Sequence, residues 1–256
     1  MGTKAIDPQT IRNVTIIGEP DATNRIAPRL HRRFTETGSG TIQWTTDRVD
    51  HTIHLTELSS RAPLAELERS IRVADGVIAV VHAAERRAPR SQTLLRVADD
   101  HQVARMCLVT GLDDVDADFD RSVATIADTR GAVPLTVQIP VGAGTGFGGV
   151  IDLVSMWALE PMGVEFFGPH WALAEQRYRD LVATVSAQDA RYSGPGAIPP
   201  DRLRDRIRGL TRIGEAVPVL CDATPRVDDV TPLLDAIVRY LPSPLHVCQP
   251  EHALDY

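Results

Sequence analysis

The stretch Val14-Thr15-Ile16-Ile17-Gly18-Glu19-Pro20-Asp21-Ala22-Thr23-Asn24-Arg25 joins an apolar, β-branched run to the start of a predicted helix. A phosphate-binding loop of the form G-x-x-x-x-G-K-[ST] occupies this place in many nucleotide-binding proteins. Aligned on Gly18, the stretch has Thr23, Asn24 and Arg25 where that motif has its second glycine, its lysine and its hydroxyl residue. The sequence therefore predicts the strand, loop and helix of a nucleotide-binding site without the residues that bind phosphate and Mg²⁺.

Each replacement removes a particular contact. A phosphate loop needs bare backbone N–H groups, a cation for the phosphates and a hydroxyl group for Mg²⁺. Thr23 places a branched side chain where the backbone must approach the phosphate, Asn24 is neutral, and Arg25 cannot ligate a metal. Arg25 is an alternative phosphate cation, but it stands one residue too late. Asp21 is either a vestige of the loop or the N-cap of the helix, and we favour the cap.

The composition sets the protein class. The chain has 256 residues, of which 43% are hydrophobic, enough for one large domain or one domain with an insert. A net charge of −7 argues against general nucleic-acid binding. The cysteines Cys107, Cys221 and Cys248 are an odd count and have no metal-ligand spacing. Cys107 lies in an apolar run, which favours a buried, reduced thiol. The first residues do not resemble a signal peptide and no apolar run nears the length of a membrane span, so we expect a cytoplasmic protein without membrane contact.

Apolar, strand-like runs alternate with helical patterns along the chain. The predicted strands are Val14–Ile17, Thr41–Thr45, His51–Leu55, Val77–His82, Met106–Thr110, Leu135–Pro140 and Val217–Leu220. The predicted helices are Arg25–Thr37, Leu64–Val73, Ser91–Gln102, Asp118–Arg130, His170–Asp189, Pro200–Ile213 and Val230–Leu241. This alternation predicts an α/β fold with a mostly parallel sheet, whose ligands bind at the carboxyl ends of the strands.

A segment from 156 to 215 interrupts this rhythm. It begins with two short runs that suit a small hairpin, Trp157–Glu160 and Val164–Phe167, and continues with two helices separated by the linker Ser193–Pro200. We therefore predict a first domain part at 12–155, an inserted subdomain at 156–215, a last strand and helix at 216–245 and a tail at 246–256.

Several strings, taken in order, point to one family. They are Arg12–Val14, Glu68–Gly76, Gly149–Met156, Pro218–Cys221 and Leu233–Pro244. In this combination the chain, from Arg12 to Leu245, resembles the G domain of bacterial elongation factor G with that family's inserted G′ subdomain. The resemblance implies a three-layer α/β, P-loop GTPase-like domain with a small α+β insert.

The same resemblance places the family's nucleotide motifs on changed residues. The phosphate loop, A-H-[IV]-D-A-G-K-T, falls on Gly18–Arg25 and keeps only Asp21 and Ala22. The first switch is largely missing, because only Gly38–Gln43 separates the first helix from the next strand. The D-T-P-G-H motif falls on the segment after the strand His51–Leu55, where Glu57 keeps a carboxylate, Ser60 replaces the glycine and Arg61 replaces the catalytic histidine.

The guanine-reading motifs are changed in the same way. N-K-x-D falls on Thr110–Asp113, of which Asp113 alone survives, and an ordinary turn aspartate is the alternative that we favour. The S-A motif near the base corresponds to Asp222 and Ala223.

Other charged or glycine-rich stretches have simpler explanations. For Arg86–Arg90 a solvated basic loop is favoured over an anion patch, and Arg29, Arg32 and Arg33 carry the same ambiguity. The arginines of Arg202–Arg208 stand at helical spacing and indicate a solvated helix face. The glycines of Gly142–Gly149 indicate a flexible connection, because no helix follows them.

The resemblance and the lost contacts together predict a pseudo-GTPase, a binding or scaffold module without catalytic residues or a metal. No cofactor is expected. GTP or GDP with Mg²⁺ belongs to the alternative, a remodelled protein for nucleotides or other phosphate ligands. A third possibility is an oligomeric protein that pairs through a sheet edge near Thr41–Thr45. The expected partners are the ribosomal stalk protein, which the family's insert meets and which His170–Asp189 would contact, or a second copy of the chain.

Overall fold

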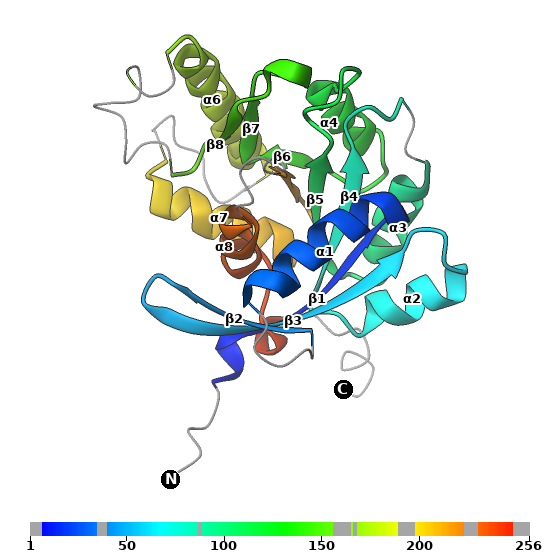
Figure 1. Cartoon of the computed structure of the whole chain (residues 1–256). Helices are drawn as coiled ribbons and strands as arrows, with labels where there is room; N and C mark the ends of the chain where they lie inside the picture. The colour runs from blue at the N-terminus through cyan, green and yellow to red at the C-terminus, as the bar shows by residue number, and fades with distance from the viewer. Residues whose placement is uncertain are drawn as a thin grey trace.

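A seven-stranded sheet forms the centre of the protein. The computed structural model describes residues 7–34, 40–86, 89–155, 165, 168–188, 198–222 and 230–247. The strands lie in the order β2-β3-β1-β4-β5-β9-β6 (Figure 1). Their bounds are β1 (Ile11–Gly18), β2 (Thr41–Thr46), β3 (Val49–Ser59), β4 (Gly76–His82), β5 (Ala104–Thr110), β6 (Pro134–Thr136) and β9 (Val217–Cys221). Of these described strands only β2 runs antiparallel to its neighbour, which confirms the predicted α/β fold.

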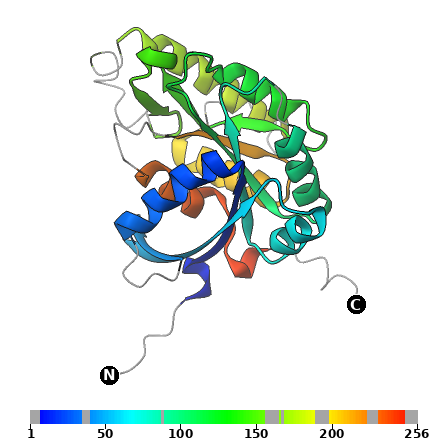
Figure 2. The ribbon, with the colours of Figure 1, turned by 45° about the vertical axis from the view of Figure 1, so that its right-hand side comes forward.

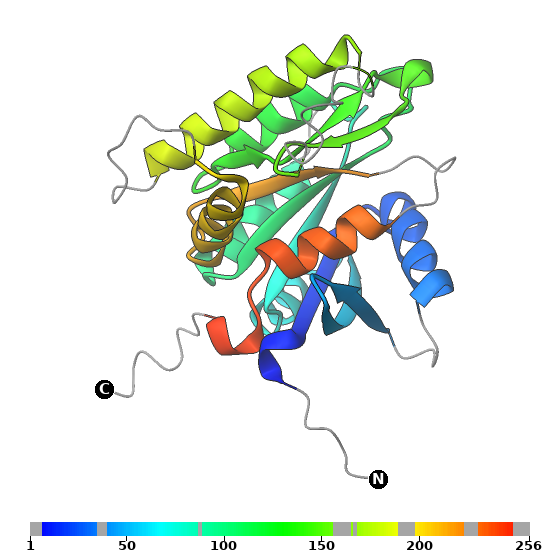
Figure 3. The ribbon, with the colours of Figure 1, turned by 90° about the vertical axis from the view of Figure 1, so that its left-hand side faces the viewer.

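Helices cover both faces of this sheet. They are α1 (Pro20–Phe34), α2 (Leu64–Arg72), α3 (Pro89–Asp100), α4 (Phe119–Ala127), α6 (His170–Gln188), α7 (Pro200–Arg212) and α8 (Thr231–Tyr240). α2 and α3 pack together on one face, while α1, α7 and α8 lie on the other (Figures 2 and 3). Coverage on both faces explains why every residue of β5 is buried and why the run Val77–Val81 in β4 is continuously apolar.

The apolar run Leu135–Pro140 is two strands, not the single strand that the sequence predicts. β6 belongs to the large sheet, whereas β7 (Gln138–Val141) pairs antiparallel with β8 (Gly149–Asp152) in a small second sheet. The change occurs at Val137, whose N–H donates to the carbonyl of Val219 and whose carbonyl accepts from Leu153. Hydrophobicity alone could not locate this change, because both strands are apolar.

The region of the predicted insert contains two long helices. α6 turns one stripe of side chains inward at a spacing of three and four residues and contacts β6 and α7. The buried members of the stripe are Trp171, Ala174, Tyr178, Leu181 and Val185. α7 packs against α8 and lies over β5 and β9. The expected hairpin at 157–167 lies, apart from Glu165, outside the described residues, and the boundaries of the insert stay a prediction.

Two arginines are buried inside strands of the sheet, Arg12 in β1 and Arg105 in β5. Arg105 is fully buried, and its guanidinium donates to the carbonyls of Leu95, Gly131 and Gly214. One of its nitrogens also lies 2.7 Å from Asp99 Oδ1. Arg105 therefore ties together three segments at the amino-terminal end of β5, because carbonyls of α3 and of two loops share one donor group.

Candidate site at the carboxyl ends of the strands

Five parallel strands end at one edge of the large sheet. β1 ends at Gly18, β3 at Ser59, β4 at His82, β5 at Thr110 and β9 at Cys221. Their parallel pairing places these ends together, and this edge is where open α/β sheets bind their ligands.

The predicted phosphate loop is the first turn of α1. Only Glu19 separates β1 from the helix, which begins at Pro20 and not at Arg25. The N–H groups of Ala22 and Thr23 donate to the carbonyl of Glu19 over 2.9 and 3.0 Å, as in a regular helix. Proline has no N–H, and its fixed φ favours the first position of a helix, so the sequence Glu-Pro-Asp starts the helix early.

This early start changes the roles of the other loop residues. Asp21 lies exposed in the first helical turn, so its assignment as the N-cap is wrong. Thr23 is buried, and its hydroxyl oxygen lies 3.3 Å from the carbonyl oxygens of Glu19 and Pro20, to which it donates. Asn24 and Arg25 belong to α1, and their side chains lie outside the described part of the structure.

The carboxylate of Glu19 lies at the centre of this edge. It accepts a hydrogen bond from the Ser60 hydroxyl over 2.8 Å and one from Arg61 Nε over 2.6 Å. Arg90 Nε, at the start of α3, lies 3.7 Å from the same carboxylate. Ser60 and Arg61 are the residues that align with the glycine and histidine of D-T-P-G-H. The donors at this position therefore already hold an anion that belongs to the chain.

Two carboxylates, those of Glu19 and Glu85, lie at this edge together with Arg61 and Arg90. Partial burial raises the pKa of Glu19, but hydrogen bonds from Arg61 and Ser60 and the charges of Arg61 and Arg90 lower it more, so the net shift is downward. Desolvation raises the pKa of Glu85; His82 opposes this shift and Glu19 adds to it. Since Glu19 and Glu85 already repel one another, a phosphate group would add a further negative charge to the same place.

Glu57 lies within β3 and not in a loop after it. The sequence predicts the end of this strand at Leu55, but β3 continues to Ser59 because it pairs with β1 as far as Gly18. The N–H of Ser60 then donates to the carbonyl of Gly18 over 2.8 Å. Glu57 is paired with Ile16 in the strand register and is exposed, so its carboxylate belongs to the strand and not to the turn that carries Ser60 and Arg61.

The ends of β4 and β5 meet through a glycine and a histidine. Thr110 is buried at the end of β5, and Gly111 follows it with φ of +67°. A Cβ atom on Gly111 would overlap the imidazole ring of His82, so the ring lies against the glycine backbone. Asp113 is exposed within a turn, which agrees with its interpretation as an ordinary turn aspartate.

An ion pair joins α1 to the end of β9. Arg29 Nη1 lies 3.0 Å from Asp222 Oδ1, and both side chains are largely buried. Arg29 is thus not a free surface cation, and Asp222 is already bound within the chain. Ala223 lies outside the described residues, as do the side chains of Arg32 and Arg33.

The structure places no metal centre among the residues that it describes, where no group of three or more His, Cys, Asp or Glu is suited to hold an ion. Cys107 and Cys221 are free, buried thiols. Burial raises the pKa of Cys107 to about 12, and burial with the charge of Asp222 raises the pKa of Cys221. Neither is a thiolate near neutral pH. None of the described helices is both long enough and apolar enough to span a membrane.

Comparison with known proteins identifies the family. The family model described as the elongation factor Tu GTP binding domain matches residues 64–243, which is more than half of the chain. The chain belongs to this family. A crystal structure of a protein from Thermus thermophilus matches with a TM-score of 0.67 at 18% sequence identity. That match covers 92% of this chain and 41% of the other, so the chain spans less than half the length of the Thermus protein.

The chain has the fold of a translational G domain. Residues that align with the family's nucleotide motifs are bound to other side chains of the chain, at two separate places. Ser60 and Arg61 meet at Glu19, and Asp222 meets Arg29. The sequence did not reveal that Glu19 is the shared acceptor or that Arg29 is paired. The signal for Glu19 was its position, one acidic residue directly between Gly18 and a helix-starting proline.

Proposed function

We propose that this protein is a pseudo-GTPase, a G domain that acts as a protein-binding or scaffold module and has little or no affinity for GTP. The observation that carries the proposal is the Glu19 carboxylate, held by Ser60 Oγ and Arg61 Nε at the start of α1. In a GTPase the corresponding edge of the sheet surrounds phosphate groups. Here the chain supplies its own anion.

The backbone at this position supports the proposal. A phosphate cradle requires several N–H groups that point away from the protein and have no other acceptor. Pro20 has no N–H, and those of Ala22 and Thr23 are used inside α1. A Cβ on Gly18 would lie 2.7 Å from Cβ of Val80, so the residue is kept small by packing against β4.

The expected loss of affinity is large. Charge-assisted hydrogen bonds contribute roughly 1.5–3 kcal/mol each, and the phosphate loop lacks the lysine, the metal ligand and part of the cradle. The loss of two or three such bonds should weaken the affinity for phosphate by about 10³-fold or more, because each 1.4 kcal/mol of binding free energy is about tenfold in affinity. Hydrolysis also needs a positioned water molecule and a group that stabilises the γ-phosphate. Arg61, which replaces the family's histidine, is bound to Glu19.

The family match covers the later part of the chain. It begins at residue 64, after the segment from Gly18 to Arg61 in which the phosphate motifs would lie. The matched residues contain the scaffold elements from α2 to α8. No metal and no resident cofactor form part of the proposed function.

Calorimetric titration of the purified protein with GTP and GDP, with and without Mg²⁺, tests the proposal. We expect no saturable, Mg²⁺-dependent binding tighter than about 1 mM, a binding free energy of about −4 kcal/mol. Phosphate release from GTP should equal that of the buffer. The Glu19→Ala variant removes the internal anion without supplying a lysine or a cradle, so it should not restore binding. Mg²⁺-dependent affinity in the micromolar range for the wild type would overturn the proposal.

The alternative is a remodelled site for a nucleotide or another phosphate ligand. Arg90 is the observation that favours it, because this partly exposed cation lies at the same edge of the sheet. In that case Glu19→Ala should strengthen GTP or GDP binding, since the carboxylate competes for Arg61 and Arg90. Equal and negligible binding by both proteins would exclude the alternative.

Two partner surfaces belong to the proposed function, in a cytoplasmic setting. The outer face of α6, which includes the exposed Leu173, is the candidate surface for the ribosomal stalk protein by likeness to the family. Strand β2 is at one edge of the large sheet, with β3 as its strand neighbour, and is the candidate surface for a second copy. Titration with purified stalk protein, comparing Leu173→Glu with the wild type, tests the first. The mass in solution tests the second.

A further inference from the structure

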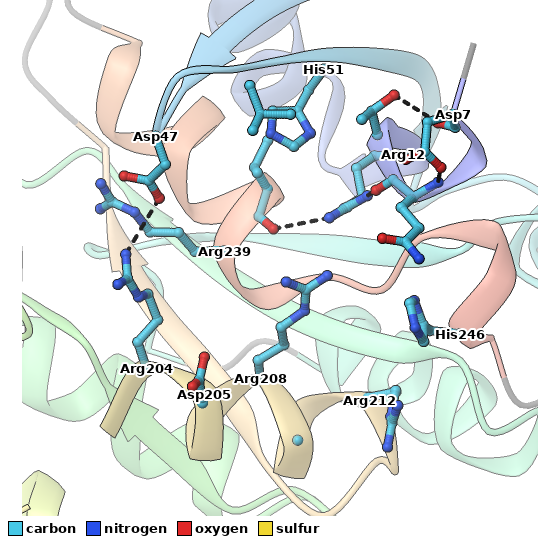
Figure 4. A pocket seen from close by; sticks show the side chains of 15 residues that line it. Asp7, Arg12, Asp47, His51, Arg204, Asp205, Arg208, Arg212, Arg239 and His246 are labelled. Atoms are coloured by element: carbon cyan, nitrogen blue, oxygen red, sulfur yellow. Dashed lines mark hydrogen bonds and ion pairs between the residues drawn. The ribbon is translucent and has the colours of Figure 1, made fainter. Parts of the chain in front are cut away.

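A hollow lies at the opposite, amino-terminal edge of the large sheet. It has a volume of about 710 Å³ and lies between the short helix η1 (Pro8–Thr10), the β2–β3 hairpin, α7, α8 and the short helix η4 (Pro244–His246) (Figure 4). This volume is within the range of about 300–1,000 Å³ that is common for small-molecule sites. We call this hollow the arginine pocket.

Positive charge dominates the arginine pocket. Its charged lining comprises five arginines and two histidines against three aspartates: Arg12, Arg204, Arg208, Arg212, Arg239, His51, His246, Asp7, Asp47 and Asp205. Three of the arginines come from α7 at intervals of four residues, so they lie along one face of that helix. The helical spacing of these arginines predicts a solvated face, but in the structure this face lies toward the hairpin and α8.

Several of these cations lack a carboxylate partner. Arg204 pairs with Asp47 over 3.4 Å, and Arg239 lies 3.3 Å from Asp235 and 3.9 Å from Asp152. Within the part of the chain that the structure describes, Arg208 and Arg212 have neither a hydrogen bond nor an ion pair. Figure 4 shows Arg208 pointing from α7 into the middle of the pocket.

Arg12 forms the wall opposite α7, and among the described residues it too meets no carboxylate directly. It is buried, and its guanidinium donates to the carbonyls of Gln9, Ile11 and Val238. Its Nε has no hydrogen-bond partner in the described structure. None of these acceptors is charged; the charge of Asp75 offsets that of Arg12 in part, and Arg12 lines the pocket from the β1 side.

The pKa shifts agree with an excess of positive charge. Burial and the charge of Arg208 lower the pKa of Arg12 to about 10, while Asp75 opposes them. Burial lowers the pKa of Arg208; Asp205 opposes this effect and Arg212 adds to it. Burial, Arg12 and Arg208 also lower the pKa of His51. A bound anion would relieve this repulsion between like charges.

We propose that the arginine pocket binds a small molecule that carries two or more linked phosphate groups, with Arg208 as the central ligand and Arg204, Arg212 and Arg239 around it. Guanidinium groups suit this chemistry because their paired N–H donors match phosphate oxygens. Several converging cations favour several linked phosphates over one. A concave pocket in a chain of net charge −7 favours a small ligand over a nucleic acid.

This site is independent of the pseudo-GTPase proposal, because it lies at the other edge of the sheet. A nucleoside di- or triphosphate shares the proposed chemistry, and any binding of it in the arginine pocket would need neither the Glu19 edge nor Mg²⁺ ligands from the protein. If substitution of Arg208 abolishes nucleotide binding, that binding takes place in the arginine pocket and not at Glu19. Nucleotide affinity that survives the substitution would belong to the Glu19 edge.

Calorimetric titration with tripolyphosphate at physiological ionic strength tests the proposal, with pyrophosphate, orthophosphate and GTP as further arms. We expect saturable binding of tripolyphosphate, weaker binding of orthophosphate, and at least a tenfold loss in Arg208→Gln. The matched control is Arg202→Gln on the same helix, an exposed arginine outside the pocket lining, which should bind as the wild type does. If GTP binds and bare polyphosphates do not, recognition depends on the nucleoside and the proposal is overturned.

A second variant protects the test against misfolding. Arg212 is exposed, so Arg212→Gln should fold and should also weaken tripolyphosphate binding severalfold. Circular dichroism and urea unfolding establish that each variant is native before titration. The proposal is wrong if wild-type protein shows no saturable binding at millimolar tripolyphosphate, or if both pocket variants bind as tightly as Arg202→Gln.

Discussion

Replacing Arg105 by methionine should destabilise the protein strongly, because one guanidinium serves three carbonyls and a carboxylate at the amino-terminal end of β5. The guanidinium donates to Leu95, Gly131 and Gly214 and pairs with Asp99. Methionine keeps the apolar stem in the core but has no donor. All four acceptors then lose the same partner at once.

The magnitude follows from which acceptors water can reach. The bond to Leu95 is buried, so its loss should cost about 1–3 kcal/mol. Gly131, Gly214 and Asp99 line a shallow hollow at the surface, where water can replace part of the lost bonding. Release of the buried charge, whose pKa burial lowers, offsets some of this cost. We expect a net loss of about 2–4 kcal/mol, near the value for breaking a buried ion pair from one side.

Urea unfolding followed by circular dichroism measures this loss. With a typical slope of about 1–3 kcal/mol per molar urea, the transition midpoint of Arg105→Met should fall by about 0.7 M or more. Arg202→Met is the matched control, since Arg202 is exposed on α7 and should change stability by less than about 0.5 kcal/mol. Equal midpoints for the two variants would refute the account of Arg105 as a shared donor.

Three further outcomes follow from the site. Gly111→Lys, which restores the family's lysine, should lower the free energy of unfolding by about 1–2 kcal/mol, because Gly111 has a left-handed backbone. It should also displace the His82 ring, so His82→Ala should recover part of the lost stability in thermal melts. Because the folded-state pKa of Glu19 is lowered, its stabilisation is present above the unfolded pKa and is lost as the pH falls through the folded pKa. The free energies of unfolding of wild type and Glu19→Gln, measured in urea, should therefore differ by up to about 1 kcal/mol near neutral pH and converge in acid; a constant difference would contradict this. Iodoacetamide at pH 8 should label Cys107 and Cys221 only after unfolding, as mass spectrometry of peptides would show; rapid labelling of the native protein would contradict their burial.

The sequence predicted the framework well because hydrophobic periodicity is a strong signal for long elements. The strand β4 and the long helix α6 both lie where the pattern placed them. The division of Leu135–Pro140 between two sheets could not be predicted, because it depends on which neighbours Val137 bonds. Tertiary pairing, not local preference, decides such a change.

At the site, comparison with a family motif misplaced the start of α1. The motif suggested a loop as far as Arg25, whereas Pro20 favours an earlier helix through its fixed φ. The local signal was present and was given less weight than the motif. The end of β3 shows the opposite case, because its extension to Ser59 comes from pairing with β1 and leaves no mark in its own residues.

The buried arginines were the other features that the sequence did not reveal. Arg12 and Arg105 stand in strands, where a charged residue usually indicates an exposed face, yet both are buried and donate to carbonyls. Their acceptors come from distant parts of the chain, such as Val238 for Arg12. Likewise, the arginines of α7 became a pocket only when the hairpin and α8 were placed opposite them.

The bond between Glu19 and Arg61 has a consequence for control of the protein. A conventional G protein changes state when its bound nucleotide is hydrolysed or exchanged, so exchange factors and activating proteins can control how long it is active. An acidic group fixed in the polypeptide never departs. Under the proposed function, cells would adjust the output of this domain by making and degrading it.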